Sequence, residues 1–408
     1  MKKMGKLKTV LVVFLVVALF TVISIKSEIF SKENVIAESE INNEIQINDS
    51  LDQPNTDWSI HKDKIKVKGI FLTGNSLGYN ARFNKLLNLV KETEVNTMVI
   101  DVKDDLGVLT YKSDSKLANS IGANKIVKIS NREVFKEKMK KLLDNGVYPI
   151  ARIVTFKDKV AGKSRPDLTI KTQNGNVWRD NKGNAWLNPY NKEAWEYPIE
   201  LAEEAALLGF KEIQFDYVRF PTDGNRSIID YGEIGQEKTK AQAISSFLKY
   251  ARKRIEKKGA YVSADVFGDI INVKKDSGIG QNLETLGESV DILCPMVYPS
   301  HYALGSYGVR YPDSKPYAIV NEAMERAINR LESVDKEKRA IIRPWLQDFS
   351  APWLKRDYGS HYTPYGPKQI RAQIQATYDA GLEEWIFWSA SNRYTESAFL
   401  KEDSLKNE

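Results

Sequence analysis

The amino-acid sequence predicts an α/β protein of the (β/α)8 TIM-barrel class. From residue 66 onward, short β-rich runs alternate with amphipathic helical stretches, which is typical of parallel βα units. Eight such runs occur over roughly 320 residues, and eight strands close this kind of barrel. An open doubly wound sheet has the same local pattern, but no glycine-rich phosphate loop follows the first run. We therefore expect a barrel and keep the open sheet as the alternative.

Each expected strand is short and contains mostly branched, aromatic or other apolar residues. The expected strands span 66–73, 96–103, 147–153, 211–218, 260–267, 291–298, 340–347 and 384–390. The helical candidates include 80–93, 131–144, 191–208, 236–258, 316–332 and 366–380. Several of these helices end at a glycine just before the next strand, namely at Gly146, Gly209, Gly259 and Gly381. Glycine readily adopts the left-handed conformation that stops a helix.

A long segment, residues 154–190, follows the third expected strand. It contains two turn sequences, 174–176 (Asn-Gly-Asn) and 181–184 (Asn-Lys-Gly-Asn). Pairs of this kind favour tight hairpin turns. We therefore expect a small β-hairpin insertion after strand three.

The N-terminus differs from the rest of the chain. Residues 9–25 form an uninterrupted apolar run with lysines before it, so 1–26 are predicted to be a signal anchor or a signal peptide. The nearest small-residue cleavage pattern, 35–37, lies well beyond the run, which favours an uncleaved anchor over a secreted form. The lysines indicate a single-pass membrane protein whose body lies outside the cell. Residues 27–65 are polar and predict a linker, and 66–400 are assigned to the barrel.

Composition excludes several classes of function. The chain has 60 Lys and Arg against 54 Asp and Glu, and five of the lysines lie in residues 1–26, so the remainder is close to neutral. A nucleic-acid-binding surface, which needs a local surplus of cations, is therefore not expected. One cysteine, Cys294, excludes an internal disulfide, and three histidines make a multi-histidine metal centre improbable. We expect no cofactor and no bound metal, and the sequence identifies no protein partner.

Alternation along the strands predicts which side chains point into the barrel. In 211–218, Ile213, Phe215 and Tyr217 share the face that suits helix packing, whereas Gln214 and Asp216 share the inner face. The same test on the other runs brings six polar side chains to one end of the barrel: Asp101, Lys103, Arg152, Asp216, Asp265 and Gln347. Burying unpaired charge is costly, so we expect a functional site there. A set of structural ion pairs is the alternative.

Two carboxylates on neighbouring strands suit glycoside hydrolysis, in which one acts as nucleophile or base and the other donates a proton. Asp216 is followed closely by Arg219, which would favour the ionised form expected of a nucleophile. Asp265 lies between apolar residues, which would raise its pKa and suit the acid. Asp269 and Asp348 are weaker candidates for a third carboxylate.

Aromatic side chains near the predicted strand ends strengthen the carbohydrate hypothesis, because flat rings stack on sugar faces. The predicted substrate-binding set is aromatic and polar, and comprises Asp101, Lys103, Arg152, Arg219, Tyr298, Trp345, Gln347, Trp388 and Trp178.

Four segments carry a resemblance to a known family: 98–107 (MVIDVKDDLG), 148–158 (YPIARIVTFKD), 213–221 (IQFDYVRFP) and 293–302 (LCPMVYPSHY). Over roughly 66–395 the chain resembles the bacterial "putative glycosyl hydrolase" domain of unknown function, a relative of the α-amylase superfamily. The resemblance implies a barrel and a polysaccharide-related role. It also implies a nucleophilic Asp on strand four, which Asp216 matches. On strand five it implies a Glu that acts as the general acid, where this chain has Asp265. Strand seven would carry a third Asp, where this chain has Gln347 and Asp348.

The function predicted from these observations is an extracytoplasmic glycoside hydrolase that cleaves a cell-wall or capsular polysaccharide. One alternative is a non-catalytic carbohydrate-binding surface protein on a degenerate barrel, which the departure at Asp265 keeps open. Another is a metal-dependent hydrolase using Asp101, Asp104 and Asp216.

Overall fold

The computed structural model describes residues 65–401, and Lys66–Glu408 form a structural unit of their own. The predicted membrane segment, 1–26, and the predicted linker, apart from its last residue, lie outside the described residues. Among the helices within 65–401, none is long and apolar enough to cross a bilayer.

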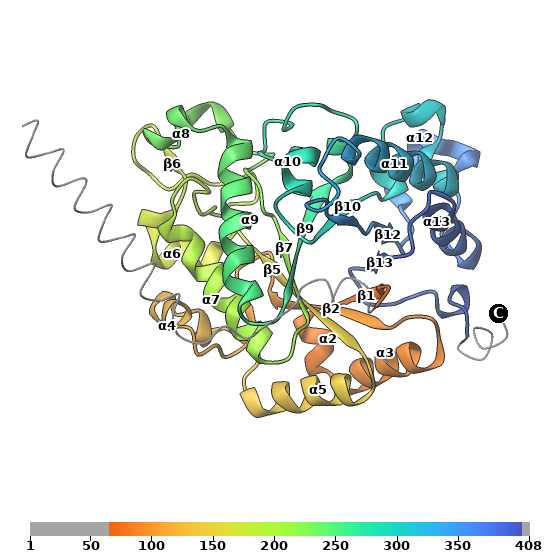
Figure 1. Cartoon of the computed structure of the whole chain (residues 1–408), viewed down its shortest axis with the longest axis horizontal. Coiled ribbons are helices and arrows are strands. Elements are labelled where there is room, and N and C mark those ends of the chain that lie inside the picture. Colours follow the sequence, from red (N-terminus) through yellow and green to blue (C-terminus); the bar gives the residue numbers. More distant parts are fainter. Residues whose placement is uncertain (1–64, 402–408) are drawn as a thin grey trace, which may run out of the picture. The chain divides into compact units, whose positions relative to one another are not determined.

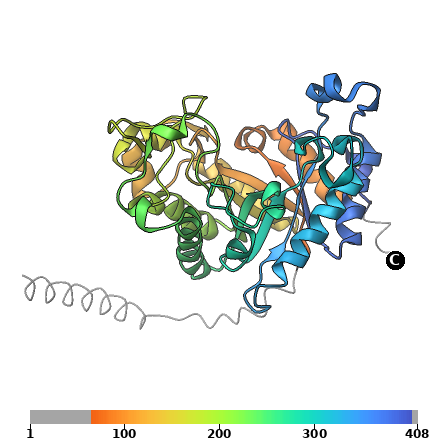
Figure 2. The ribbon, with the colours of Figure 1, turned by 90° about the horizontal axis from the view of Figure 1, so that it is seen from above.

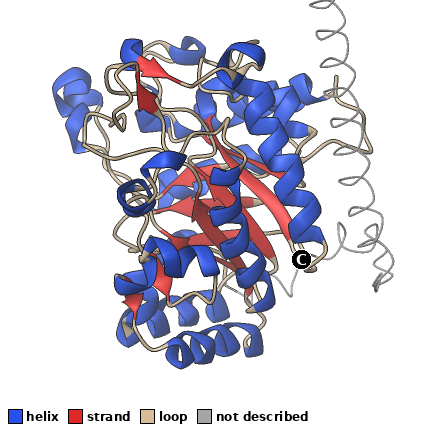
Figure 3. Ribbon diagram, turned by 90° about the vertical axis from the view of Figure 1, so that its left-hand side faces the viewer, coloured by secondary structure: helices blue, strands red, loops and turns tan. Residues whose placement is uncertain are grey.

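Eight parallel strand positions close into a barrel at the centre of the unit (Figure 3). They are β1 (Lys68–Leu72), β2 (Thr97–Lys103), β5 (Tyr148–Val154), β7 (Glu212–Asp216), β9 (Tyr261–Phe267), β10 (Ile292–Met296), β11 (Ile341–Ile342) with β12 (Trp345–Gln347), and β13 (Trp385–Trp388). Each pairs with its neighbour in chain order, and β1 pairs with both β13 and β2, which closes the ring. The predicted barrel is confirmed, and the open sheet is not found.

The helices surround the strands, with α7 and α9 on one side and α11 and α13 on the other (Figures 1 and 2). The long helices are α3 (Asn80–Glu92), α5 (Arg132–Asp144), α7 (Glu193–Leu207), α9 (Lys240–Glu256), α11 (Pro316–Leu331) and α13 (Pro367–Asp379). Shorter ones are α2 (Gly74–Gly78), α4 (Lys116–Ile121), α6 (Lys159–Ser164), α8 (Ile234–Glu237), α10 (Leu283–Gly287) and α12 (Lys355–Tyr358). Gly209 and Gly259, between a helix and the next strand, have φ of 102° and 77°, a conformation that costs glycine little.

The seventh strand position is interrupted at Pro344, between β11 and β12. Proline has no backbone N–H and cannot donate to the sheet ladder. Pairing continues on both sides of it, because Arg343 N donates to Leu293 O (2.9 Å) and Ile386 N donates to Pro344 O (3.0 Å).

The two faces of the strands contribute to two separate apolar clusters. Outward side chains such as Met98, Ile100 and Phe215 pack with the helices. Inward side chains form a smaller cluster inside the barrel, which includes Phe71 and Val99. This division follows the alternation predicted from the sequence.

Two excursions leave the barrel. After β2, β3 (Leu109–Tyr111) pairs antiparallel to β2, and β4 (Val127–Ile129) pairs with β3. After β5, residues 169–187 make antiparallel bridges with one another, and Thr172 N donates to Asn176 O across the 173–175 turn. The strand β6 (Lys171–Thr172) also pairs with β8 (Ile229–Asp230), which lies in the loop after β7. The loop after β5 and the loop after β7 are therefore joined by strand pairing.

Candidate active site

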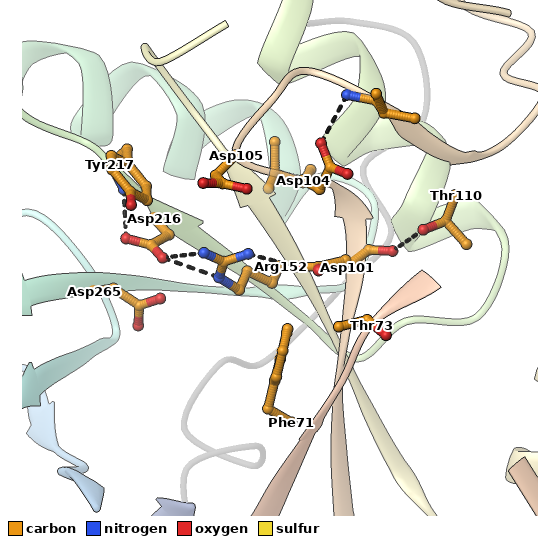
Figure 4. Close-up of polar contacts among 12 residues, drawn as sticks. Phe71, Thr73, Asp101, Asp104, Asp105, Thr110, Arg152, Asp216, Tyr217 and Asp265 are labelled. Atoms are coloured by element: carbon orange, nitrogen blue, oxygen red, sulfur yellow. Dashed lines mark hydrogen bonds and ion pairs between the residues drawn. The ribbon is translucent and has the colours of Figure 1, made fainter. Parts of the chain in front are cut away.

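Arg152 joins two carboxylates at the carboxyl ends of neighbouring strands. Its Nε and Nη2 atoms donate to Asp216 Oδ2 at 2.9 and 2.5 Å, and Nη1 donates to Asp101 Oδ1 at 2.5 Å. Asp101, Arg152 and Asp216 come from β2, β5 and β7, and all three side chains are buried. Figure 4 shows Arg152 between Asp216 and Asp101, with Asp265 on the Asp216 side.

The contacts of Asp216 favour a carboxylate held in a fixed orientation. The guanidinium of Arg152 binds Oδ2, and the backbone N–H of Tyr217 donates to Oδ1 at 2.6 Å. Both oxygens thus accept hydrogen bonds, which stabilises negative charge. Asp101, on the other side of Arg152, differs: burial raises its pKa to about 6, although Arg152 acts in the opposite direction.

Asp265, on β9, has a different environment. Its Oδ1 accepts a hydrogen bond from Trp345 Nε1 at 2.6 Å, and it has no ion pair with a described residue. Burial, and then the negative charge of Asp216, raise the pKa of Asp265 well above its usual range, while Arg152 and Trp345 lower it by less. The raised pKa favours the protonated form of Asp265, which is the form that a proton donor needs.

The two carboxyl groups lie at the same level of the barrel. The β7–β9 register pairs Phe215 with Ala264, so Asp216 and Asp265 follow one residue later on neighbouring strands. They line a common cavity of about 250 Å³. The rest of its lining is cationic, aromatic or apolar: Arg152, Tyr217, Arg219, Phe267, Met296, Tyr298, Trp345 and Trp388. Two carboxylic acids in an aromatic cavity can perform acid–base and nucleophilic chemistry on a sugar.

Tyr217 does not follow the predicted alternation. It has a positive φ of 47°, which is uncommon for a residue other than glycine, and β7 ends at Asp216. Its ring therefore lines the cavity instead of lying on the helix-facing side of a longer strand. Backbone strain of this kind concentrates at functional sites.

Seven of the predicted site residues line the cavity: Asp216, Asp265, Arg152, Arg219, Tyr298, Trp345 and Trp388. Asp101 does not line it but accepts a hydrogen bond from Arg152. The structure places Lys103, Gln347 and Trp178 elsewhere. Lys103 is fully buried and pairs with Asp158 at 2.6 Å, because the β2–β5 register shifts between Asp101 and Lys103 and the alternation slips there.

The other two lie in the surrounding loops. Gln347 Oε1 accepts from Ser300 N (3.1 Å) and its Nε2 donates to Asp313 (3.0 Å), so its amide is occupied by the loops that follow β10. Trp178 is buried in the insertion, where its Nε1 donates to Asn225 O at 2.8 Å. The weaker carboxylate candidate Asp348 accepts two hydrogen bonds from Thr395 and does not line the cavity.

Phe71 is a further residue beside the site, and it was not among the predicted site residues. Its ring stacks on Trp388 with centroids 4.1 Å apart, and the Cζ atom of Arg152 lies 5.5 Å from the Phe71 ring centre. Cation–π contacts of this kind help to hold a buried guanidinium. Alternation along β1, which places Phe71 on the inner face, was the signal that could have identified it.

The proposed metal set does not assemble. Asp101 and Asp216 are held by Arg152. Asp104 accepts hydrogen bonds from the backbone N–H groups of Leu106 and Val108 and forms an ion pair with Lys128 at 3.2 Å. Within residues 65–401, no group of three or more His, Cys, Asp or Glu side chains is arranged to bind a metal ion.

The fold and the sequence have relatives among known proteins. The structure is similar to the PgaB (BpsB) glycoside hydrolase domain from Bordetella bronchiseptica, with a TM-score of 0.54 and 13% identity over 81% of this chain and 95% of that one. It is also similar to an α-amylase from Lactobacillus plantarum, with a TM-score of 0.50 and 11% identity over 80% of this chain and 71% of that one. These low identities show a common fold only.

A hypothetical protein from Ruminiclostridium thermocellum ATCC 27405 is 40% identical over 48% of this chain and 97% of its own length, with a TM-score of 0.44. No curated protein matches the chain. Residues 69–394, nearly all of the barrel, match the family model described as "Putative glycosyl hydrolase domain". The chain therefore belongs to this glycosyl hydrolase family.

Proposed function

We propose that this protein is an extracytoplasmic glycoside hydrolase that cleaves a polysaccharide with Asp216 as nucleophile and Asp265 as general acid. The observation that carries the proposal is the contrast between the two carboxyl groups. Both are buried. Asp216 accepts hydrogen bonds from a guanidinium and a backbone N–H, whereas Asp265 has a raised pKa and accepts one hydrogen bond from the indole N–H of Trp345. Glycoside hydrolysis requires one carboxyl group that donates a proton and a second that acts as nucleophile or base.

In the first step, a carboxylate oxygen of Asp216 attacks the anomeric carbon, and the proton of Asp265 passes to the departing glycosidic oxygen. In the second step, the Asp265 carboxylate takes a proton from water, and the resulting hydroxide displaces Asp216 from the sugar. Retention of configuration is expected, because side chains at one level of neighbouring strands start from backbones about 4.8 Å apart. An inverting enzyme needs roughly 6.5–9.5 Å between its carboxyl groups to admit a water.

A row of aromatic rings supports a polymeric substrate. Tyr298 lines the cavity, its ring centre lies 5.9 Å from that of Phe349, and Phe349 lies 6.3 Å from Trp353 in a stacked arrangement. Trp353 is 59% exposed, although a tryptophan ring is large and apolar. Rings that continue from a catalytic cavity to the surface can bind further sugar units of the same chain.

The N-terminal sequence supports the location. An apolar run at 9–25 preceded by lysines would anchor the chain in the cell membrane with the barrel outside, where wall and capsular glycans are found.

The test is incubation of the purified full-length protein with bacterial wall and capsular polysaccharides, followed by measurement of reducing ends. New reducing ends that disappear in the Asp216→Asn variant would support the proposal. Glycan binding without any release of reducing ends would instead favour a non-catalytic carbohydrate-binding protein.

A further inference from the structure

Arg219 is a buried cation that has no carboxylate partner among residues 65–401. The residue is 6% exposed. Within residues 65–401 its side chain makes one hydrogen bond, in which Nη1 donates to the carbonyl oxygen of Phe220 at 3.0 Å. The other buried arginines of the described chain, Arg152 and Arg343, each contact two carboxylates. A guanidinium carries five N–H donors and remains charged in proteins, so most of the donors of Arg219 have no acceptor in the described part of the protein.

Aromatic rings hold this guanidinium in place. Its Cζ atom lies 4.6 Å from the ring centre of Phe267, 4.9 Å from that of Tyr217 and 5.1 Å from that of Trp186. Cation–π attraction offsets part of the cost of burial but supplies no hydrogen-bond acceptor. The rings fix the position of the charge, and they leave its N–H groups available.

The guanidinium lines the same cavity as the catalytic pair. Arg152, the other cation of this lining, is already engaged by Asp101 and Asp216. An anionic sugar would be repelled by the carboxylate of Asp216 unless an uncommitted cation compensated the charge. Arg219 is the cation in this lining that meets the requirement.

We propose that Arg219 binds an anionic substituent, a carboxylate or a phosphate, on the sugar unit beside Asp216, so that the substrate is an acidic polysaccharide. This inference rests on the proposed function. A guanidinium suits either group, because its N–H pairs match the oxygens of carboxylate and phosphate in a bidentate arrangement. With a neutral glycan in the cavity, a desolvated guanidinium would instead face only hydroxyl groups.

Binding can be tested separately from turnover, using the full chain and its intrinsic tryptophan fluorescence, to which Trp186 beside Arg219 contributes. The probes are glucuronate, inorganic phosphate and glucose. We expect glucuronate or phosphate to bind more tightly than glucose, and which of the two binds distinguishes a carboxylate substituent from a phosphate. Binding should weaken roughly 10- to 100-fold in Arg219→Met, as expected for loss of hydrogen bonds to a charged group, and less in Arg219→Lys.

Lys157→Met is the matched control. Lys157 is equally buried and lies over the same Tyr217 ring, at 4.8 Å, but it already pairs with Asp105 at 3.1 Å. Its removal should leave anion binding unchanged. Equal binding of all three probes by the wild-type protein, or equal anion binding by wild type and Arg219→Met, would overturn the inference.

Turnover supplies the second arm, with an acidic polysaccharide that the wild-type protein cleaves and the same material after reduction of its carboxyl groups or removal of its phosphate. Arg219→Met should lower kcat/KM on the acidic form by roughly 10- to 100-fold more than on the neutral form. An equal loss on both forms would show that Arg219 only supports the fold of the site. Cleavage of neutral glycans alone would overturn the inference and leave the proposed hydrolase function intact.

Discussion

Arg152 and Arg343 each bridge two carboxylates inside the same barrel, one near the ends of the strands and the other near their beginnings. Arg343 contacts Glu212 at 2.8 Å and Glu384 at 2.7 Å. Strand β7 contributes to both clusters, since Glu212 is its first residue and Asp216 its last. Each cluster therefore consists of a buried arginine between two buried carboxylates, and β7 contributes one carboxylate to each.

They differ in what remains after the ion pairs have formed. In the lower cluster, which lies near the beginnings of the strands, the carboxylates of both Glu212 and Glu384 contact Arg343. The upper cluster is the one around Arg152 at the strand ends. In the upper cluster, Asp265 lies beside the ion pairs with a tryptophan N–H as its partner, and a cavity opens in front of it. A buried ion pair alone does not identify an active site, because structural pairs exist. The upper cluster differs by an additional carboxyl group that faces a cavity, and the proposed active site rests on this difference.

Asp216→Asn should break this comparison most strongly. The amide still accepts a hydrogen bond from Arg152 but cannot attack the anomeric carbon, so turnover should fall by roughly 10⁴-fold, as for other catalytic residues. Reducing-end release per folded molecule measures this loss. Urea unfolding measures the stability, which should also fall, because Arg152 then keeps only Asp101 as a carboxylate partner. Retained turnover would remove Asp216 from the mechanism.

Asp265→Ala should show a loss that depends on the leaving group. Removal of a general acid costs roughly 10²- to 10⁴-fold on a natural glycan, and less on aryl glycosides whose leaving group needs no proton. Because Asp265 must be protonated to act, wild-type activity should fall as the pH rises through its raised pKa. This alkaline limb should be absent from the pH profile of the variant on aryl glycosides. An identical loss on both substrate types would contradict the acid assignment.

Glu212→Gln tests the opposite end of the same strand. Removing one partner of a buried ion pair should lower the free energy of unfolding by roughly 3 kcal/mol. The loss should not be larger, because Arg343 still keeps Glu384 as a carboxylate partner. Urea unfolding measures this change. Turnover per folded molecule should stay near the wild-type value, and a selective loss of turnover would show that the two clusters are functionally coupled.

The sequence was sufficient to predict the barrel, because alternation and helix-stopping glycines are local signals. Predicted helix 131–144, for example, is observed as Arg132–Asp144. Alternation also brought Asp216, Asp265 and Arg152 to one cavity. It failed where the backbone departs from a regular strand, at the register shift that turns Lys103 toward Asp158 and at the positive φ of Tyr217.

Non-local contacts explain the remaining differences. The amide of Gln347 is occupied by Asp313 and Ser300, and the indole of Trp178 by the carbonyl of Asn225. These partners lie 34 to 47 residues away along the chain. No pattern within one strand or hairpin indicates such a partner. Strand alternation suggested a binding role for Gln347, and the aromatic side chain suggested one for Trp178.

Trp353→Ala should produce the smallest effect and define how far the upper site extends. If Trp353 stacks on a sugar unit outside the cavity, its removal should weaken binding of long chains by about 1 kcal/mol, the range for aromatic contacts. KM for a polysaccharide should rise several-fold, while kcat/KM for a short aryl glycoside should not change. Trp353→Phe keeps a flat ring next to Phe349 and should restore most of the affinity. An unchanged KM for long chains would confine the site to the cavity around Asp216 and Asp265, since the exposed ring would then make no contact with the substrate.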